Sequence, residues 1–446
     1  MKAFRDSFKL GLCLFFVWSL ALAQEDLVTF LSALQNNPAI IANKSLVDAA
    51  KAQLDAVYSP ISGTVSGGMV FASYSDDIAP PLAEALPDST GQFSVGASFR
   101  PFVYGDFADL AEQRRVALAQ AKLSYQQTLA NLEAQAIEAA AQLLQAEEGL
   151  KLARQARDLA QHSLDVTQIR LDKGVASQAD LRSAQERLFQ SENQIQTAEA
   201  GVNLAKQGLV LLVGDVSLEN LPELPLAQGI SVEVKQAEFN IALSKIGIAS
   251  SERAFYPVVQ AGLALPLNDD KSEIGLSIES RTLQPKVEYS YQNPKQSAGG
   301  IGLPQGLEVN QVEAVFSIGV SATISVDQFN NLDAAKAQVA AAEAGLKGAQ
   351  DRANLTALSL SNSYQSTVRS LELAKLTLQN AQRTLEENQK RQEAGLAIDL
   401  EVDQAVLAVK QAELGILSAQ IEVLKSILST YKTYAQPISE TLEESQ

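Results

Sequence analysis

Cysteine and histidine are almost absent from this chain of 446 residues, which holds one of each, Cys13 and His162. A lone histidine lacks the partners that a metal site or a catalytic triad requires. A single cysteine leaves no disulfide framework. No glycine-rich phosphate loop or nucleophile elbow appears either. We therefore expect no metal, no cofactor and no catalytic residues, and we interpret His162 as part of a solvated helix surface.

Long apolar runs are also missing, apart from one at the start of the chain. Residues 1–23 place Lys2, Arg5 and Lys9 before an apolar stretch that ends in Ala21-Leu22-Ala23. This order is typical of a secretory signal peptide with a small-x-small cleavage site. No later stretch reaches the roughly 18 apolar residues of a transmembrane helix. If the mature protein enters a membrane, we expect a β-barrel, which satisfies the backbone polar groups in lipid.

Positive charge is in deficit. The chain has 35 Lys and Arg against 52 Asp and Glu, a net charge of −17. The predicted signal peptide carries a net charge of +2, so the remainder carries −19. Phosphate backbones require a basic face, and this balance argues against nucleic acid as a partner.

Proline is missing from two long spans, between Pro101 and Pro222 and between Pro304 and Pro437. Both spans are rich in Ala, Gln, Leu and Glu, which favour helix. An interior proline costs about 3 kcal/mol, so its absence over such lengths predicts long helices. From Tyr125 to Leu171 apolar residues follow alternating steps of four and three, as in a coiled coil. The same register recurs 221 positions later, which indicates an internal duplication.

One short interruption occurs in both spans. RLDKGVASQADLRSAQ begins at Arg170 and RQEAGLAIDLEVDQAV begins at Arg391. Gly174 and Gly395 are expected to end one helix each, because glycine adopts the positive φ that closes a helix. We predict helices over residues 107–172 and 178–212 in the first copy, joined as a hairpin. Ser177 and Asp180 fit a capping box for the return helix, and Asp399 is expected to cap the equivalent helix.

Between the helical spans the sequence alternates apolar and small polar residues. Six segments are predicted as strands, and together they fit short membrane strands or ordinary soluble ones. They are residues 61–74, 92–104, 257–267, 273–279, 286–291 and 312–326. The resulting domains are a first repeat over residues 24–220 (lead-in helix, two strands, long hairpin), a linker over 221–228, a second repeat over 229–436 and a C-terminal tail over 437–446.

This layout resembles TolC-type outer-membrane efflux proteins across nearly the whole mature chain. The repeated pattern G-x-x-x-x-x-[DE]-[VL]-x-x-A carries the resemblance. It stands as Gly174, Asp180, Leu181 and Ala184 in the first copy, and as Gly395, Glu401, Val402 and Ala405 in the second. The duplicated order of helices and strands around the pattern makes the resemblance more specific than the short motif alone.

The resemblance implies the fold and the function. The fold is a mixed membrane β-barrel and long α-helical coiled-coil barrel, internally duplicated, in a homotrimeric tube with four strands from each chain. The function is an outer-membrane exit duct of a tripartite efflux or type I secretion system, passive and not an enzyme, with a long periplasmic extension. Its partners are outer-membrane lipid, a periplasmic adaptor (membrane fusion protein) and an inner-membrane pump or ABC transporter.

Two departures from the family pattern stand out. The last strand of the second half meets its long helix at ISVDQFNN, without the Pro and Gly that are usual there, whereas the first half has Pro101 and Gly105. The second half also offers more than two strands, so part of residues 257–279 is expected to be a loop or a hairpin outside the barrel wall.

The resemblance also suggests site residues. Glu401 and Asp180 are candidates for a carboxylate ring at the narrow end of the tunnel, where three copies would favour cations. The alternative is that both acids only stabilise a helix N-terminus. Candidates for adaptor contact at the hairpin tips are Gly174, Val175, Ala176, Gly395, Leu396 and Ala397. Plain helix termination by the two glycines explains these residues equally well.

Other function classes remain open. A periplasmic coiled-coil adaptor, or a structural protein of the cell envelope, would also carry long helical hairpins. Such an adaptor has one hairpin rather than two in tandem. A glycosidase of the envelope is a further alternative, although long heptad spans leave no compact pocket.

Overall fold

A computed structural model describes residues 26–71, 89–216, 218, 220–267, 272–293 and 314–444, so the predicted signal peptide lies outside the described residues. The chain divides into two compact units. The first unit consists of Met1–Leu46, Lys122–Gln236 and Gly348–Gln446, and the second of Val47–Ala121 and Ala237–Lys347.

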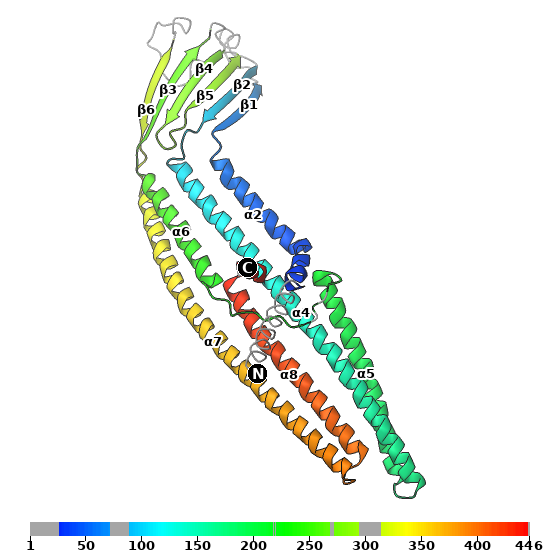
Figure 1. The fold of residues 1–446 in the computed structure, drawn as a ribbon. Helices are drawn as coiled ribbons and strands as arrows, with labels where there is room; N and C mark the ends of the chain where they lie inside the picture. Colours follow the sequence, from blue (N-terminus) through cyan, green and yellow to red (C-terminus); the bar gives the residue numbers. More distant parts are fainter. Residues whose placement is uncertain are drawn as a thin grey trace, which may run out of the picture. The chain divides into compact units, whose positions relative to one another are not determined.

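Six helices form three pairs that match between the two halves (Figure 1). The first half contains α2 (Pro38–Val57), α4 (Asp106–Asp172) and α5 (Gln178–Val213), and the second half contains α6 (Val232–Arg253), α7 (Val326–Glu393) and α8 (Asp399–Tyr434). The long helices α4 and α7 have 67 and 68 residues, and α5 and α8 have 36 each. The two halves therefore share the order and nearly the lengths of their helices.

All six predicted strand segments form strands, and they lie in one sheet in the second unit. The strands are β1 (Ile61–Phe71), β2 (Ser89–Phe99), β3 (Val258–Pro266), β4 (Ser272–Glu279), β5 (Lys286–Asn293) and β6 (Val315–Ser321). Their order is β1-β2-β5-β4-β3-β6, and every neighbouring pair is antiparallel. The resemblance implied four strands from each chain, whereas this sheet contains six. Residues 257–279, part of which was expected as a loop or a hairpin outside the barrel wall, form β3 and β4, which pair over seven residues.

The sheet has one apolar and one polar face. The register aligns Val65, Val95, Tyr289, Ile274 and Leu265 in one row across five strands. The next row, on the opposite face, aligns Ser66, Ser94, Ser290 and Glu273. Since successive residues of a strand point to opposite faces, alternation in the sequence becomes a division between the two faces.

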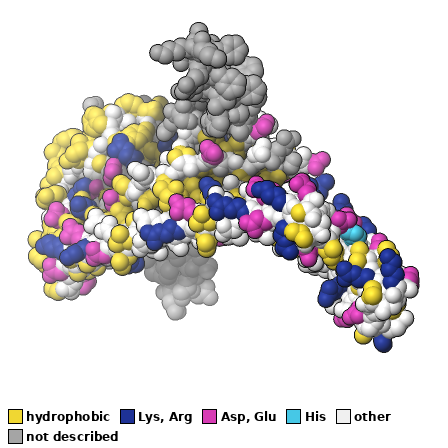
Figure 2. Space-filling view, turned by 60° about the horizontal axis from the view of Figure 1, so that its bottom comes forward, with side chains coloured by type: hydrophobic (Ala, Val, Ile, Leu, Met, Phe, Trp, Pro, Cys, Tyr) yellow, Lys and Arg dark blue, Asp and Glu magenta, His cyan; other side chains and the backbone are white. Residues whose placement is uncertain are grey.

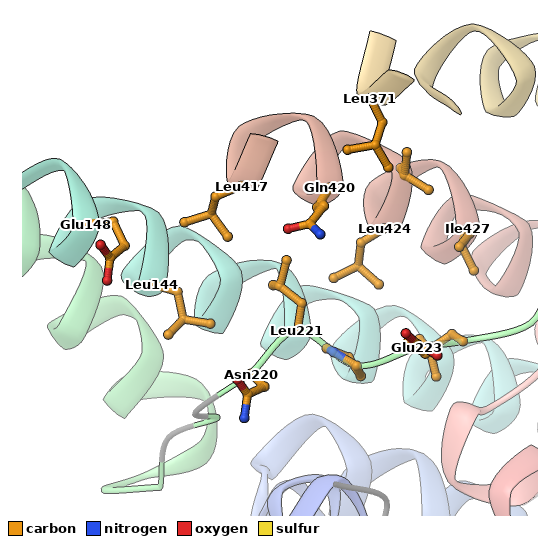
Figure 3. Close-up of a pocket in the computed structure, with 13 residues that line it drawn as sticks. Leu144, Glu148, Asn220, Leu221, Glu223, Leu371, Leu417, Gln420, Leu424 and Ile427 are labelled. Carbon is orange, nitrogen blue, oxygen red and sulfur yellow. The ribbon is translucent and has the colours of Figure 1, made fainter. Parts of the chain in front are cut away.

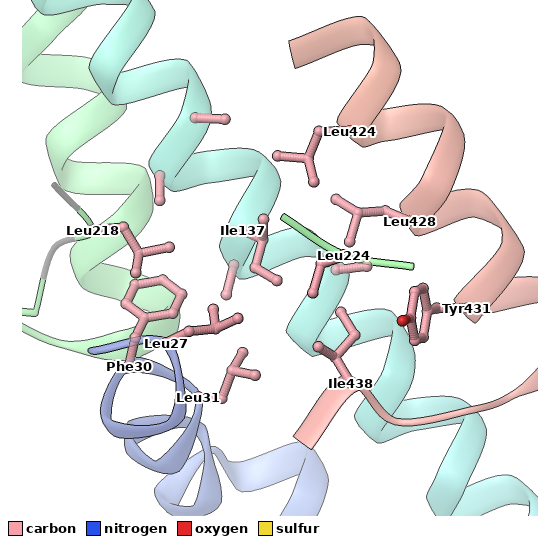
Figure 4. Close-up of a cluster of buried hydrophobic side chains, with 14 of the residues drawn as sticks. Leu27, Phe30, Leu31, Ile137, Leu218, Leu224, Leu424, Leu428, Tyr431 and Ile438 are labelled. Atoms are coloured by element: carbon pink, nitrogen blue, oxygen red, sulfur yellow. The ribbon is translucent and has the colours of Figure 1, made fainter. Parts of the chain in front are cut away.

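A hydrophobic core in the first unit joins segments that are distant in the sequence (Figure 4). The helical residues 26–32 contribute Leu27, Phe30 and Leu31. Further members are Ile137 of α4, Leu218 and Leu224 of the irregular segment between α5 and α6, Leu424, Leu428 and Tyr431 of α8, and Ile438. The start of the described chain, the segment between the halves and the C-terminal end thus share one buried cluster.

Residues 437–446, expected as a tail, include the short helix α9 (Ile438–Glu444). Ile438 is fully buried, and its amide donates a hydrogen bond to the carboxylate of Glu133 on α4. Ser439 donates to the same carboxylate from its amide and its hydroxyl. Glu133 therefore supplies the acceptor that the first amides of a helix lack within the helix itself. Burial raises the pKa of Glu133, and these hydrogen bonds oppose the rise.

The long helix of the second half begins without the expected Pro and Gly because a capping box takes their place. The Ser325 amide donates to Gln328 Oε1 at 3.1 Å, and the Gln328 amide donates to Ser325 Oγ at 3.4 Å. The sequence signal is S-x-x-Q, an established variant of the capping box. The sequence analysis missed this signal within ISVDQFNN.

The visible helical surface carries charges of both signs, interspersed with polar and apolar side chains (Figure 2). Among the described residues, no helix combines the length and the apolar character needed to cross a membrane.

Candidate functional site: the two helix turns

The two repeated fragments form two turns of the same geometry in the first unit. Gly174 and Gly395 have φ of 73° and 69°. The amide of Gly174 donates to the Leu171 carbonyl at 2.8 Å, and the amide of Val175 donates to the Arg170 carbonyl at 2.9 Å. Gly395 and Leu396 make the same bonds to Gln392 and Arg391. This pair of bonds is the Schellman motif, so the prediction that both glycines end a helix is confirmed.

Both turns expose an apolar side chain at the position after the glycine. Val175 and Leu396 are 74% and 72% exposed. Ala176 and Ala397 follow them and are partly buried. None of the residues that the structure describes covers either large side chain, and an uncovered apolar side chain is the condition for a contact patch.

Asp180 is engaged at its helix end. Its carboxylate accepts hydrogen bonds from the Ser177 amide at 2.8 Å and the Ser177 hydroxyl at 2.7 Å. The Asp180 amide donates back to Ser177 Oγ, which confirms the predicted capping box of α5. The bonds from the Ser177 amide and hydroxyl lower the pKa of Asp180.

Glu401 stands at the equivalent position but lacks such a partner. Ile398 replaces the capping serine, and α8 has no side-chain cap. The prediction that Asp399 caps this helix is wrong, because Asp399 is its first residue and accepts from Gln392 Nε2 at 2.7 Å. Glu401 Oε2 is buried without a hydrogen-bond partner among the described residues. The two acids are thus equivalent in sequence but not in bonding.

His162 and Asp403 form a contact that the sequence analysis missed. His162 Nδ1 on α4 lies 2.7 Å from Asp403 Oδ2 on α8, with both side chains partly exposed. Figure 2 shows the histidine in cyan at the surface. His162 thus lies on a partly solvated helix surface, as interpreted from the sequence, and Asp403 is a partner in addition. No local signal reveals the pair, because 241 positions separate the two residues.

An apolar groove of about 570 Å³ lies between α4, α8 and the segment that joins the halves (Figure 3). Leu144, Leu221, Leu371, Leu417 and Leu424 line it, with Glu148 and Glu223 among its few charged residues. Apart from these two carboxylates, the lining consists of apolar side chains and the amides of Asn220 and Gln420.

Comparison with protein families gives a match to the family described as "Outer membrane efflux protein", over residues 31–215 and 226–430. The chain belongs to this family. The matched region contains both helix turns and all six strands. No curated protein matches the sequence.

Several solved structures share the fold at low sequence identity. A membrane protein from Pseudomonas aeruginosa is 17% identical, with a TM-score of 0.63 over 94% of this chain and 91% of the other. The outer membrane protein VceC from Vibrio cholerae is 15% identical, with a TM-score of 0.62 over 94% and 96%. The CmeC outer membrane channel of Campylobacter jejuni is 14% identical, with a TM-score of 0.61 over 95% and 89%.

Family membership identifies the protein as an outer-membrane channel, the exit duct of an efflux system. It resides in the outer membrane and has long periplasmic helices. Its family is one of channel proteins and not of enzymes. The alternative of a periplasmic adaptor is not favoured.

Proposed function

We propose that three copies of the chain close into one tube that crosses the outer membrane as a β-barrel and continues as a helical periplasmic tunnel. The sheet supports this closure. Five antiparallel steps separate β1 from β6, so β6 of one copy runs antiparallel to β1 of the next. The β6 edge of each copy can therefore pair with the β1 edge of the next copy. A closed ring of three copies then leaves no unpaired strand edge in lipid.

The exposure of side chains on the two edge strands, β1 and β6, supports the same arrangement. On the apolar face, Val65 of β1 and Phe316 of β6 are 72% and 66% exposed, whereas Val95 and Tyr289 of the interior strands are 40% and 37% exposed. A neighbouring strand at each edge would cover the outer residues to the same degree as the inner ones.

The two helix turns are proposed as the contact for a periplasmic adaptor, which connects the channel to an inner-membrane pump or ABC transporter. The observation that carries this proposal is the matched exposure of Val175 and Leu396 beside a bare glycine backbone. Gly174, Ala176, Gly395 and Ala397 complete the surface, because small residues let a partner helix approach closely.

Glu401 is proposed to contribute to a carboxylate ring near the three-fold axis, where the tunnel narrows. Its unpaired, buried oxygen distinguishes it from Asp180, whose carboxylate is occupied by the capping box. We therefore assign the helix-capping role to Asp180 and the constriction role to Glu401. In this arrangement Glu401→Gln lowers the preference of the channel for cations, and Asp180→Asn does not.

Photo-crosslinking from the turns tests the adaptor contact. Val175→Cys and Leu396→Cys, labelled with benzophenone maleimide in intact cells, are expected to crosslink to one other envelope protein. Leu204→Cys on α5, at a side chain that is also 72% exposed, is the matched control. Equal crosslinking to that protein from all three positions, or none from the turns, would overturn the proposed contact.

The mass of the purified particle tests the trimer separately. A particle with the mass of one chain would overturn the trimer.

A further inference from the structure

The β4–β5 hairpin is built into the middle of the sheet. β5 pairs with β2 over eight residues, and β4 pairs with β3 over seven. Each strand of the hairpin has eight residues, similar to the nine of β3 and the seven of β6. The hairpin therefore separates β2 from β3, pairs with both along nearly its full length and belongs to the same sheet as β1, β2, β3 and β6.

The hairpin continues the apolar face of the neighbouring strands. Ile274, Leu276 and Ile278 of β4 lie on the same face as Val287 and Tyr289 of β5. The register continues this face to Val95 and Ala97 of β2 and to Leu263 and Leu265 of β3. A shift of one residue would exchange the apolar and polar faces of the hairpin. A hairpin that lay outside the sheet would have no need to keep its apolar residues in register with those of β2 and β3.

The turn of the hairpin is fitted against the junction of β2 and α4. Gly105, directly before α4, has φ of 59°, and a Cβ atom there would overlap the carbonyl of Arg281 in the turn. The backbone of the junction thus approaches the turn as closely as only glycine permits.

All charged residues within the six strands belong to this hairpin. They are Glu273, Glu279, Lys286 and Glu288, and all four lie on the polar face. Lys286 Nζ lies 2.7 Å from Glu288 Oε2, and Ser290 Oγ donates to Glu273 Oε1 at 3.2 Å. The remaining strands offer Ser, Thr, Gln, Gly and a few apolar residues on that face. The hairpin therefore brings a net charge of −2 to an otherwise uncharged surface.

We propose that the β4–β5 hairpin is a pore-wall element that widens the barrel and lines it with a ring of negative charge selective for cationic solutes. The proposal rests on the three-chain assembly proposed above. The exposed apolar face suits lipid, which turns the polar face to the lumen. Six strands from each of three chains give eighteen strands in place of twelve. The barrel diameter rises roughly 1.5-fold, since diameter grows about linearly with strand number.

The first test locates the two faces of β4 with a pair of adjacent residues. Cys13 is the only cysteine and lies in the predicted signal peptide, so an introduced cysteine is unique in the mature chain. In planar bilayers, a charged methanethiosulfonate reagent is expected to lower the conductance of Ser277→Cys in up to three steps. Ile278→Cys, on the other face, is expected not to respond. Equal responses, or a response of Ile278→Cys alone, would overturn the proposal.

The second test uses charges of opposite sign on the same hairpin. Glu279→Gln is expected to shift the reversal potential in a KCl gradient toward zero, because it removes three negative charges from the lumen. Lys286→Gln is expected to shift it the other way. A general disturbance of the barrel would move both variants in the same direction. Unchanged potentials in both variants would sink the charge ring while leaving the channel itself intact.

The third test removes the hairpin. Deletion of residues 272–293 leaves β1, β2, β3 and β6, in which β2 and β3 again run antiparallel. A folded twelve-stranded channel is expected to have roughly half the lumen cross-section, with lower conductance in proportion. Unchanged conductance would contradict the widening. If the deletion does not fold, the cysteine pair still decides the proposal. A wild-type protein that forms no channel would end both this inference and the proposed function.

Discussion

His162 Nδ1 on α4 lies 2.7 Å from Asp403 Oδ2 on α8, which joins the long helix of the first repeat to the return helix of the second. Their side chains are 39% and 45% exposed, so water screens the contact. Exposed pairs of this kind contribute about 0.2–1 kcal/mol.

The contact predicts a measurable coupling between the two repeats. In a double-mutant cycle on thermal unfolding, His162→Gln and Asp403→Asn are expected to couple by about 0.2–1 kcal/mol. The pair Lys410 and Glu413, which lies within α8 alone, is the control for an exposed pair that joins no repeats. Strictly additive effects of the His162 and Asp403 variants would show that the contact contributes nothing.

Glu133 is expected to make the attachment of α9 depend on pH. Burial raises the pKa of Glu133 above its ordinary value of 4.5, so the folded state binds the proton more tightly than the unfolded chain. The free energy of unfolding then falls as pH rises from 4.5 through the raised folded pKa, and it stays lower above that range. Below pH 4.5 the free energy of unfolding is no longer reduced by this group, because Glu133 is protonated in both the folded and the unfolded state.

Two variants separate the charge of Glu133 from its hydrogen bonds. Glu133→Gln keeps an acceptor for the Ile438 amide and is expected to remove the pH dependence. Glu133→Ala leaves buried donors unpaired and is expected to cost about 1–3 kcal/mol. Thermal unfolding between pH 4 and 8, with hydrogen exchange at the Ile438 amide, measures both effects. Slow exchange at Ile438 in Glu133→Ala would contradict the capping role.

The two helix turns differ in the residue that precedes the return helix, Ser177 before α5 and Ile398 before α8. Removing the cap from α5 is expected to destabilise its first turn, and adding a cap to α8 is expected to stabilise its first turn. Ser177→Ala removes the capping box of α5, at a cost of about 1 kcal/mol. Ile398→Ser places S-x-x-E before α8 and gives Glu401 a partner, so the amides of its first turn should exchange more slowly with solvent. Hydrogen exchange at residues 178–181 and 399–402 is the measurement. Unchanged protection in both variants would show that packing, and not capping, holds these ends.

Gly105 is expected to tolerate no side chain. Gly105→Ala meets the Arg281 carbonyl and places a non-glycine residue at positive φ, which alone costs about 1–3 kcal/mol. Gly68→Ala is the matched control, because no atom lies within 4 Å of a Cβ atom at that strand position. The yield of folded protein in outer-membrane fractions is the readout. Equal yields would show that the β4–β5 turn and the start of α4 can move apart without loss of folded protein.

Local features of this protein follow from the sequence alone, because they depend on residues within one or two helical turns. Gly174, Gly395 and the Ser177–Asp180 capping box lie where the pattern placed them. The long helices follow from the absence of proline. The two local errors also have local causes. Ile398 replaces the capping serine of the second turn, and S-x-x-Q at Ser325 replaces Pro and Gly.

Contacts between distant segments were decided only by the tertiary structure. The contact of His162 with Asp403, the capping of α9 by Glu133 and the place of β4 and β5 between β2 and β3 join residues 241, 305 and nearly 200 positions apart. Periodicity shows which face of an element is apolar, but not which element covers it. That choice depends on packing and on backbone hydrogen bonds between segments, which are satisfied only when the whole chain has folded.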